Sequence, residues 1–125
     1  MYNQYMDKTF TIKETAKLTN LSAHTLRYYE KIGLLPEIQR DSNGYREYTE
    51  TDISWIYFLL RLRDTGMSIE NMKTFANLRS QGSQTVEERK NMLKIHRTKI
   101  MEDINKLQTN LEKINDKIAF YSSLK

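Results

Sequence analysis

One short stretch, SAHTLRYYEKIG from Ser22 to Gly33, holds an imidazole, a guanidinium, an ammonium group and two phenol rings. On a helix, four of these side chains recur at positions i, i+3, i+4 and i+7 and therefore share one side. They are His24, Arg27, Tyr28 and Lys31. Such groups donate hydrogen bonds to base edges and phosphate oxygens, and a helix fits the major groove of DNA. DNA recognition in the major groove is therefore one chemistry that this row could perform.

The opposite side of the same helix carries Ala23, Leu26 and Tyr29, which form an apolar face suited to a core. An ordinary amphipathic helix with a solvated polar face shows the same division. The row of donors alone therefore leaves both interpretations open, and the surrounding elements must decide between them.

Two helix starts frame a helix-turn-helix. Thr11 followed by Glu14 fits a capping box, which predicts a short helix from Ile12 to about Thr19. After a tight turn, Ser22 is the natural N-cap of the second helix, which is predicted to end at Gly33. Helix, short turn and second helix make up the helix-turn-helix arrangement.

A β-hairpin is predicted to follow the second helix. Asn43-Gly44 lies between two short alternating segments and accepts the positive φ angles of a type I′ turn. In the second strand, Arg46 and Tyr48 face the same way and are candidates for clamping a phosphate and its sugar. For Tyr45, packing on the core is an equally good interpretation. A hairpin beside a helix-turn-helix is a wing.

Two further helices complete the compact domain. Thr49 and Asp52 form a weaker capping box for a third helix that ends at Gly66, and Ser68 caps a fourth. The third helix is predicted to be the central core element through Ile53, Ile56, Phe58, Leu59, Leu60 and Leu62. Arg63 near its end fits either the helix dipole or a phosphate contact.

The last segment shows a heptad pattern, with apolar residues at alternating steps of four and three. The positions are Leu93, Ile100, Ile104, Leu107, Leu111, Ile114, Ile118 and Tyr121. Arg97 and Lys90 interrupt the pattern toward the N-terminus. Nothing else in a short chain covers such a stripe, so a homodimer is predicted; folding back onto its own domain is the alternative.

These elements predict a mainly α fold, a winged helix-turn-helix domain followed by a long dimerisation helix. The predicted boundaries are an N-terminal extension at 1–9, the DNA-binding domain at 10–79, a linker at 80–84 and the helix at 85–125. The net charge is +4, but residues 1–66 hold nine Lys/Arg and nine Asp/Glu. The placement of charges, rather than their sum, therefore carries the prediction of a nucleic-acid partner.

Several classes are excluded or disfavoured. The 125 residues contain no cysteine, which excludes disulfides, thiolate metal sites and cysteine nucleophiles. His96 alone makes a poor metal site, so no metal or cofactor is expected. There is no glycine-rich phosphate loop, HExxH motif or nucleophile elbow, so an enzyme is not expected. The longest apolar run, Trp55 to Leu60, is too short to span a bilayer, and a cytoplasmic protein is expected.

The segments FTIKETAKLTNLSAHTLRYYEKIGLL and NGYREYTETDISWIYFLLRLRDTGMSIENMK resemble the MerR family of bacterial transcription regulators. The resemblance covers Phe10 to about Arg79 in sequence and the remainder in architecture, and TLRYYEKIGLL followed by GYREY is its most specific part. It implies an antiparallel coiled coil that joins two subunits, each reading half of a near-palindromic promoter operator. It further implies that the bound protein distorts the promoter spacer, so that RNA polymerase is an indirect partner.

Carried over by position, the resemblance implies DNA contacts by Arg27, Tyr28, Tyr29, Arg46, Tyr48 and Arg63. His24 and Thr25 lie near the start of the second helix, at positions that vary within the family and could read base edges. Metal-sensing and redox-sensing members use cysteines, and drug-binding members carry an additional domain; neither is expected here. An architectural protein resembling the winged excisionases is the main alternative, although these generally lack a long heptad helix.

Overall fold

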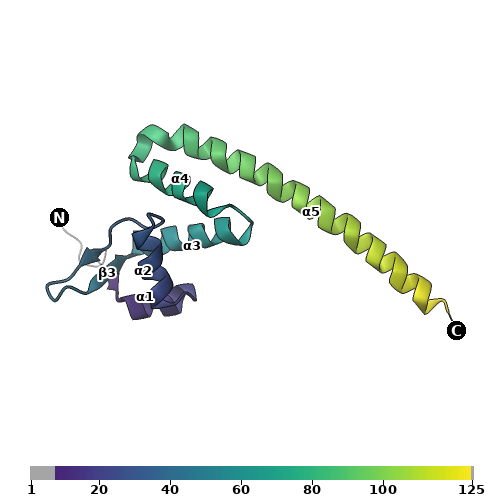
Figure 1. Ribbon diagram of the computed structural model, residues 1–125, viewed down its shortest axis with the longest axis horizontal. Helices are drawn as coiled ribbons and strands as arrows, with labels where there is room; N and C mark the ends of the chain where they lie inside the picture. Colours follow the sequence, from purple (N-terminus) through teal and green to yellow (C-terminus); the bar gives the residue numbers. More distant parts are fainter. Residues whose placement is uncertain (1–7, 125) are drawn as a thin grey trace. The chain divides into compact units, whose positions relative to one another are not determined.

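The structure, a computed structural model, describes residues 8–124 and divides into two compact units after Val86 (Figure 1). The fold is mainly α with a small sheet, as predicted. Its elements are β1 (Thr9–Phe10), α1 (Ile12–Thr19), α2 (Ala23–Lys31), β2 (Gln39–Arg40), β3 (Arg46–Thr49), α3 (Glu50–Asp64), α4 (Ile69–Ser80), the 3-10 helix η2 (Gly82–Thr85) and α5 (Val86–Ser122). Of the predicted N-terminal extension, residues 1–7 lie outside the described part.

The caps predicted for α1 and α2 are confirmed. The Thr11 hydroxyl accepts from the Glu14 amide at 3.0 Å, and the Glu14 carboxylate accepts from the Thr11 amide at 2.9 Å. The Ser22 hydroxyl accepts from the Thr25 amide at 3.0 Å and begins α2. Gly33, with φ +88°, follows the last residues of α2, where the left-handed conformation favours glycine. These local bonds fix where both helices of the helix-turn-helix begin and end.

The hairpin turn is not type I′, because Gly44 has a positive φ of 84° and Asn43 does not. The Gly44 amide donates to the Asp41 carbonyl at 3.0 Å, and the Asp41 carboxylate accepts from the amides of Asn43 and Tyr45, both at 2.9 Å. A turn followed by a glycine in the left-handed conformation is typical of hairpin loops that are longer than two residues. The Asp41 side chain stabilises it by satisfying two loop amides, which a two-residue turn would not require.

The sheet has the strand order β1-β3-β2, and both pairings are antiparallel. Phe10 lies opposite Tyr48, and Arg40 lies opposite Arg46. The central strand β3 leads directly into α3, where Thr49 and Asp52 form the predicted capping box. The wing is thereby attached to the helical core through its strand β3.

The core of the first unit surrounds α3. Among the fully buried side chains are Leu26, Leu34, Tyr48, Ile56 and Leu59. Trp55 of α3 is also buried; its Nε1 donates to the Leu34 carbonyl at 2.8 Å, and its ring stacks on Phe75 of α4 with centroids 5.9 Å apart. Trp55 is therefore a core residue that joins α3 to α4 and to the loop after α2.

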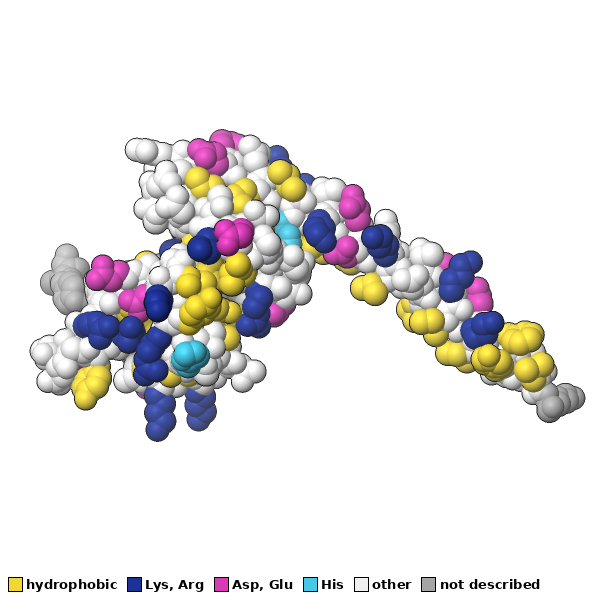
Figure 2. Space-filling view, in the orientation of Figure 1, with side chains coloured by type: hydrophobic (Ala, Val, Ile, Leu, Met, Phe, Trp, Pro, Cys, Tyr) yellow, Lys and Arg dark blue, Asp and Glu magenta, His cyan; other side chains and the backbone are white. Residues whose placement is uncertain are grey.

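Helix α5 has 37 residues, which corresponds to about 55 Å at the usual helical rise. Most heptad positions are exposed in the single chain; Leu93 and Ile100 are half-buried, and Leu107 is 68 % exposed. Figure 2 shows hydrophobic side chains, in yellow, gathered at the surface toward the C-terminal end of α5. No described helix is both long enough and apolar enough to cross a membrane.

Candidate nucleic-acid interface

Helix α2 divides into the two faces that its sequence predicts. Leu26 is fully buried and Tyr29 is 8 % exposed, so this side anchors the helix in the core. On the other side, His24, Arg27 and Lys31 are exposed, together with Tyr28. Burying one face fixes the rotation of α2 about its axis, and the row of donors consequently lies at the surface.

Thr25 occupies the border between these faces and is half-buried. Its amide donates to the Ser22 hydroxyl, and its own Oγ1 accepts from that hydroxyl at 2.9 Å. The Thr25 hydroxyl keeps its proton available as a donor, because in the Ser22 contact it acts as an acceptor. Its position at the start of α2 is the one at which recognition helices contact base edges.

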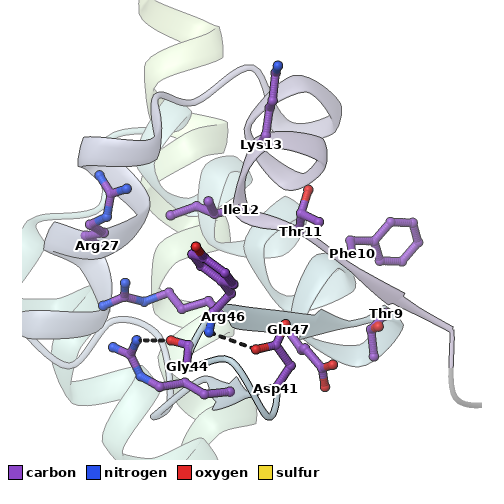
Figure 3. A pocket seen from close by; sticks show the side chains of 12 residues that line it. Thr9, Phe10, Thr11, Ile12, Lys13, Arg27, Asp41, Gly44, Arg46 and Glu47 are labelled. Atoms are coloured by element: carbon purple, nitrogen blue, oxygen red, sulfur yellow. Dashed lines mark hydrogen bonds between the residues drawn. The ribbon is translucent and has the colours of Figure 1, made fainter.

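A cleft of about 340 Å³ lies between the start of α1, helix α2 and the wing. Four cationic side chains line it: Lys13, Arg27, Arg40 and Arg46. Asp41 and Glu47 are its two acidic side chains. Figure 3 shows Arg27 and Arg46 extending toward the same side of the cleft from α2 and from β3. The concave surface therefore carries an excess of positive charge, which suits a phosphate backbone.

The sequence analysis missed Lys13 and Arg40 as candidates. Lys13 lies in the first turn of α1, and Arg40 ends β2, where its Nη1 donates to the Gly44 carbonyl at 2.8 Å. Neither belongs to a periodic row of donors, so the pattern of α2 could not indicate them. In the sequence, only their positive charge marked these two residues as candidates for a DNA contact. The fold adds the decisive information, because it brings both side chains to the same cleft.

An ion pair joins the wing to α2. Arg46 Nε donates to Glu30 Oε1 at 2.8 Å, and the Ile38 amide donates to Glu30 Oε2 at 3.3 Å. The Arg46 and Glu30 side chains are only 20 % and 16 % exposed. One carboxylate on α2 thus holds both the strand β3 and the loop that leads into the wing. Arg46 is consequently positioned by the protein before any ligand binds.

Replacing Glu30 by glutamine is expected to lower the free energy of unfolding by about 1–2 kcal/mol, because a largely buried guanidinium loses its charged partner. Urea unfolding of the two proteins measures the difference. Glu37→Gln is the matched control, since Glu37 is exposed in the adjacent loop. Equal stability losses in the two variants would show that the Glu30 pair does not brace the wing.

The structure does not support two of the predicted DNA contacts. Tyr48 is fully buried, and Tyr29 is 8 % exposed, so neither ring is presented to a ligand in this conformation. Burial raises the pKa of Tyr48, Arg46 opposes this rise and Glu30 adds to it. The alternation of β3 was predicted to place Tyr48 beside Arg46 at the surface, but that face of the central strand packs on the helices. We therefore withdraw Tyr48 and Tyr29 as direct contacts.

Arg63 is exposed at the end of α3 and has protein partners of its own. Its Nη2 lies 3.0 Å from the Asp64 carboxylate. Its pKa is raised, first by a hydrogen bond with the Tyr29 side chain and then by one with Asp64. A phosphate that bound Arg63 would compete with Asp64 for the guanidinium.

Among residues 8–124, no cluster of three or more His, Asp or Glu side chains could hold a metal ion. Four acidic side chains of the first unit instead have structural roles: Glu14 and Asp52 in caps, Asp41 in the hairpin turn and Glu30 in the ion pair of Arg46. The site consequently consists of donors and cations arranged on a recognition helix and a wing. Fold and site together define a winged helix-turn-helix protein.

Two family models match the chain. Residues 11–48 match the MerR family regulatory protein, and residues 53–117, more than half of the chain, match the model described as MerR, DNA binding. An uncharacterized HTH-type transcriptional regulator of Haemophilus influenzae is 37 % identical over 117 residues, covering 94 % of this chain and 87 % of that protein. The regulator AdhR of Bacillus subtilis is 44 % identical over 91 residues, which is 73 % of this chain and 65 % of AdhR.

Solved structures agree with this result. HiNmlR, a MerR family regulator lacking the sensor domain and bound to promoter DNA, superposes with a TM-score of 0.84 at 36 % identity, covering 92 % of this chain and 91 % of that one. A MerR family regulator from Bacillus thuringiensis superposes with a TM-score of 0.80 at 33 % identity, covering 91 % and 100 %. This chain belongs to the MerR family of transcriptional regulators.

Proposed function

We propose that this protein binds a near-palindromic promoter operator as a homodimer and distorts the spacer of that promoter. The exposed face of α2 beside the cationic cleft is the observation that carries the proposal. A recognition helix reads base edges while a wing and neighbouring cations hold the phosphate backbone. HiNmlR, which this chain resembles over nearly its whole length, is bound to promoter DNA in its structure.

The homodimer follows from the exposed stripe of α5. A two-fold dimer presents two copies of α2, so its operator must contain two inverted half-sites whose separation matches that of the two helices. A rigid dimer whose heads do not match straight DNA gains its contacts by deforming the duplex. RNA polymerase is then affected through the shape of the promoter rather than by a direct contact.

The remaining features of the proposal follow from this function. The DNA-binding domain is taken as residues 10–79, the linker as 80–84 and the dimerisation segment, which contains α5, as 85–125. The protein acts in the cytoplasm, where the promoter is, and it requires neither catalysis nor a cofactor. The architectural alternative predicts binding without a preferred sequence, and the exposed apolar stripe of α5 favours the dimeric regulator over it.

The proposed DNA contacts have two roles. Thr25→Ala and His24→Ala are expected to change the preferred operator sequence, because these residues lie at the start of α2 and face base edges. Arg46→Ala is expected to weaken binding to all sequences alike, since Arg46 lies in the wing beside the backbone cleft. Binding to a set of operator variants, measured for each protein, distinguishes the roles. Equal losses on every sequence for both kinds of variant would contradict this division.

Transcription in vitro tests the distortion. Promoters that differ only in the length of the spacer between their −35 and −10 elements are transcribed with and without the protein. Distortion predicts that the protein activates the promoter with an overlong spacer and does not activate one of optimal length. Activation that is independent of spacer length would overturn the distortion while leaving operator binding intact.

A further inference from the structure

Another hollow of the first unit, which we call the Trp55 hollow, lies apart from the cationic cleft. Its volume is about 290 Å³, and it is bounded by the loop after α2, by α3 and by α4, which lies beside α3 (Figure 1). The side chains that matter here are Leu34, Leu35, Trp55, Ala76, Lys73 and Arg79. The hollow and the cleft share no lining residue. A ligand can therefore occupy the hollow without covering the proposed DNA contacts.

Hydrogen bonds of the core hold the apolar walls of the Trp55 hollow in place. The amides of Leu34 and Leu35 both donate to the Tyr29 carbonyl, at 2.9 and 3.1 Å. Trp55 Nε1 donates to the Leu34 carbonyl, and the indole stacks on Phe75. Leu34, Leu35 and Trp55 are at most 5 % exposed. The walls are therefore formed before any ligand binds, which reduces the entropy that binding costs.

The charged residues of the Trp55 hollow are both cations. Lys73 and Arg79 line it, and none of its lining residues is acidic. The Arg79 guanidinium carbon lies 4.5 Å from the centre of the Trp55 ring, and this cation–π contact holds the charge beside the indole. Within residues 8–124, no ion pair joins Lys73 to a carboxylate. The charges of the hollow therefore favour an anion.

One face of α4 presents polar groups to the hollow. Lys73, Asn77 and Ser80 recur at i, i+4 and i+7 and line it together. The Ser80 hydroxyl donates to the Asn77 carbonyl at 2.6 Å, so its proton is already engaged. The carbonyl end of a helix also disfavours a nearby anion. An anionic group is consequently expected beside Lys73, two turns before the end of α4.

The volume of the hollow limits the size of its ligand. A cavity of about 150 Å³ holds benzene, so the Trp55 hollow has room for one ring with a short side chain. Most pockets for drug-sized ligands are larger, at about 300–1,000 Å³. We propose that the Trp55 hollow binds a small carboxylate that carries one aromatic ring, with the ring between the apolar walls and the carboxylate at Lys73. This site goes beyond operator binding, and its tests need no DNA.

Trp55 is the only tryptophan of the chain, so its fluorescence reports on the hollow directly. Phenylacetate is titrated into the full chain, and we expect a saturable change in emission with a dissociation constant on the order of 1 mM for so small a ligand. Calorimetry measures the same constant independently. Phenylacetamide has the same ring without the charge, and it is expected to bind at least about tenfold more weakly.

Two substitutions test the two parts of the site. Lys73→Gln removes the charge, and Ala76→Leu fills part of the hollow; each is expected to weaken phenylacetate binding at least about tenfold. Arg61→Gln is the matched control, because Arg61 is an exposed cation of α3 that does not line the hollow. Ala76 is buried, so urea unfolding verifies that its variant is folded, whereas Lys73 is only half-buried.

The possible failures lead to different conclusions. If neither fluorescence nor heat saturates well above the expected dissociation constant, the site is overturned, while the proposed operator binding is unaffected. Equal binding of phenylacetamide, or unchanged binding by the Lys73→Gln protein, would overturn recognition of a carboxylate at Lys73. Unchanged binding by a folded Ala76→Leu protein would show that the ligand lies elsewhere and would overturn the site as well.

Discussion

Leu107→Asp is expected to convert the protein into a monomer and to reduce its affinity for an intact operator by at least about 100-fold. Leu107 is 68 % exposed in the single chain and lies within the heptad stripe of α5. Because the dimer contains two copies of residue 107, the substitution removes two leucines from the interface. The burial of each leucine stabilises the dimer by roughly 2–3 kcal/mol, and each is replaced by a carboxylate that is costly to bury. Sedimentation measures the oligomeric state, and a titration with operator DNA measures the affinity.

Ile95→Asp provides the control for this substitution. Ile95 lies on the same helix and is 74 % exposed, but it falls outside the heptad stripe. It is expected to remain dimeric and to bind the operator as the unmodified protein does. A dimeric Leu107→Asp protein with normal affinity would show that α5 does not form the interface through this stripe. A monomeric Ile95→Asp protein would show that the interface lies on the face of α5 that carries Ile95 rather than on the heptad stripe.

Arg27→Ala is expected to weaken operator binding by about 30- to 1,000-fold in the dimer, since the change is made in both half-sites. Arg27 is exposed on α2 and also lines the cationic cleft, so it lies where base edges and the backbone are both within reach. The unfolding transition is expected to be unchanged, because the side chain is not part of the core. Titration at several salt concentrations separates the loss of a phosphate contact, which lowers the salt dependence, from the loss of a base contact.

Lys17→Ala is the matched control for Arg27→Ala. Lys17 is an exposed cation of α1 in the same unit, and it does not line the cleft. Removing it changes the net charge by the same amount as removing Arg27. Equal losses of affinity in the two variants would indicate that binding depends on total charge rather than on the geometry of α2 and the wing.

Local chemistry made much of the fold predictable. Thr11, Ser22, Thr49 and Ser68 each begin a helix through a hydrogen bond to an amide three residues on, so the chain's own short-range contacts specify these starts. The apolar period of α2 likewise predicted which of its residues are buried. These features depend on residues that are close in sequence, and a pattern can therefore reveal them.

Features that depend on distant residues were harder to predict. One local feature was also predicted wrongly: the Asp41 carboxylate, two and four residues from the amides that donate to it, determines a hairpin turn that Asn43-Gly44 by itself does not favour. Glu30 and Arg46 are 16 residues apart, and neither periodicity nor spacing indicates their pairing. Tyr48 was predicted to contact DNA, but it is buried, because the alternation of a strand does not indicate which of its faces packs on the core. Lys13 and Arg40 became candidates only through the fold.

Selection from random DNA tests most directly whether this protein reads an operator as a dimer. The purified protein is incubated with a pool of random-sequence duplexes, and the bound fraction is recovered and sequenced. We predict enrichment of a two-fold symmetric site with two inverted half-sites. Binding without an enriched sequence would contradict this prediction and favour the architectural alternative. Enrichment of a single unpaired half-site would also contradict it and would favour a protein that reads DNA as a monomer.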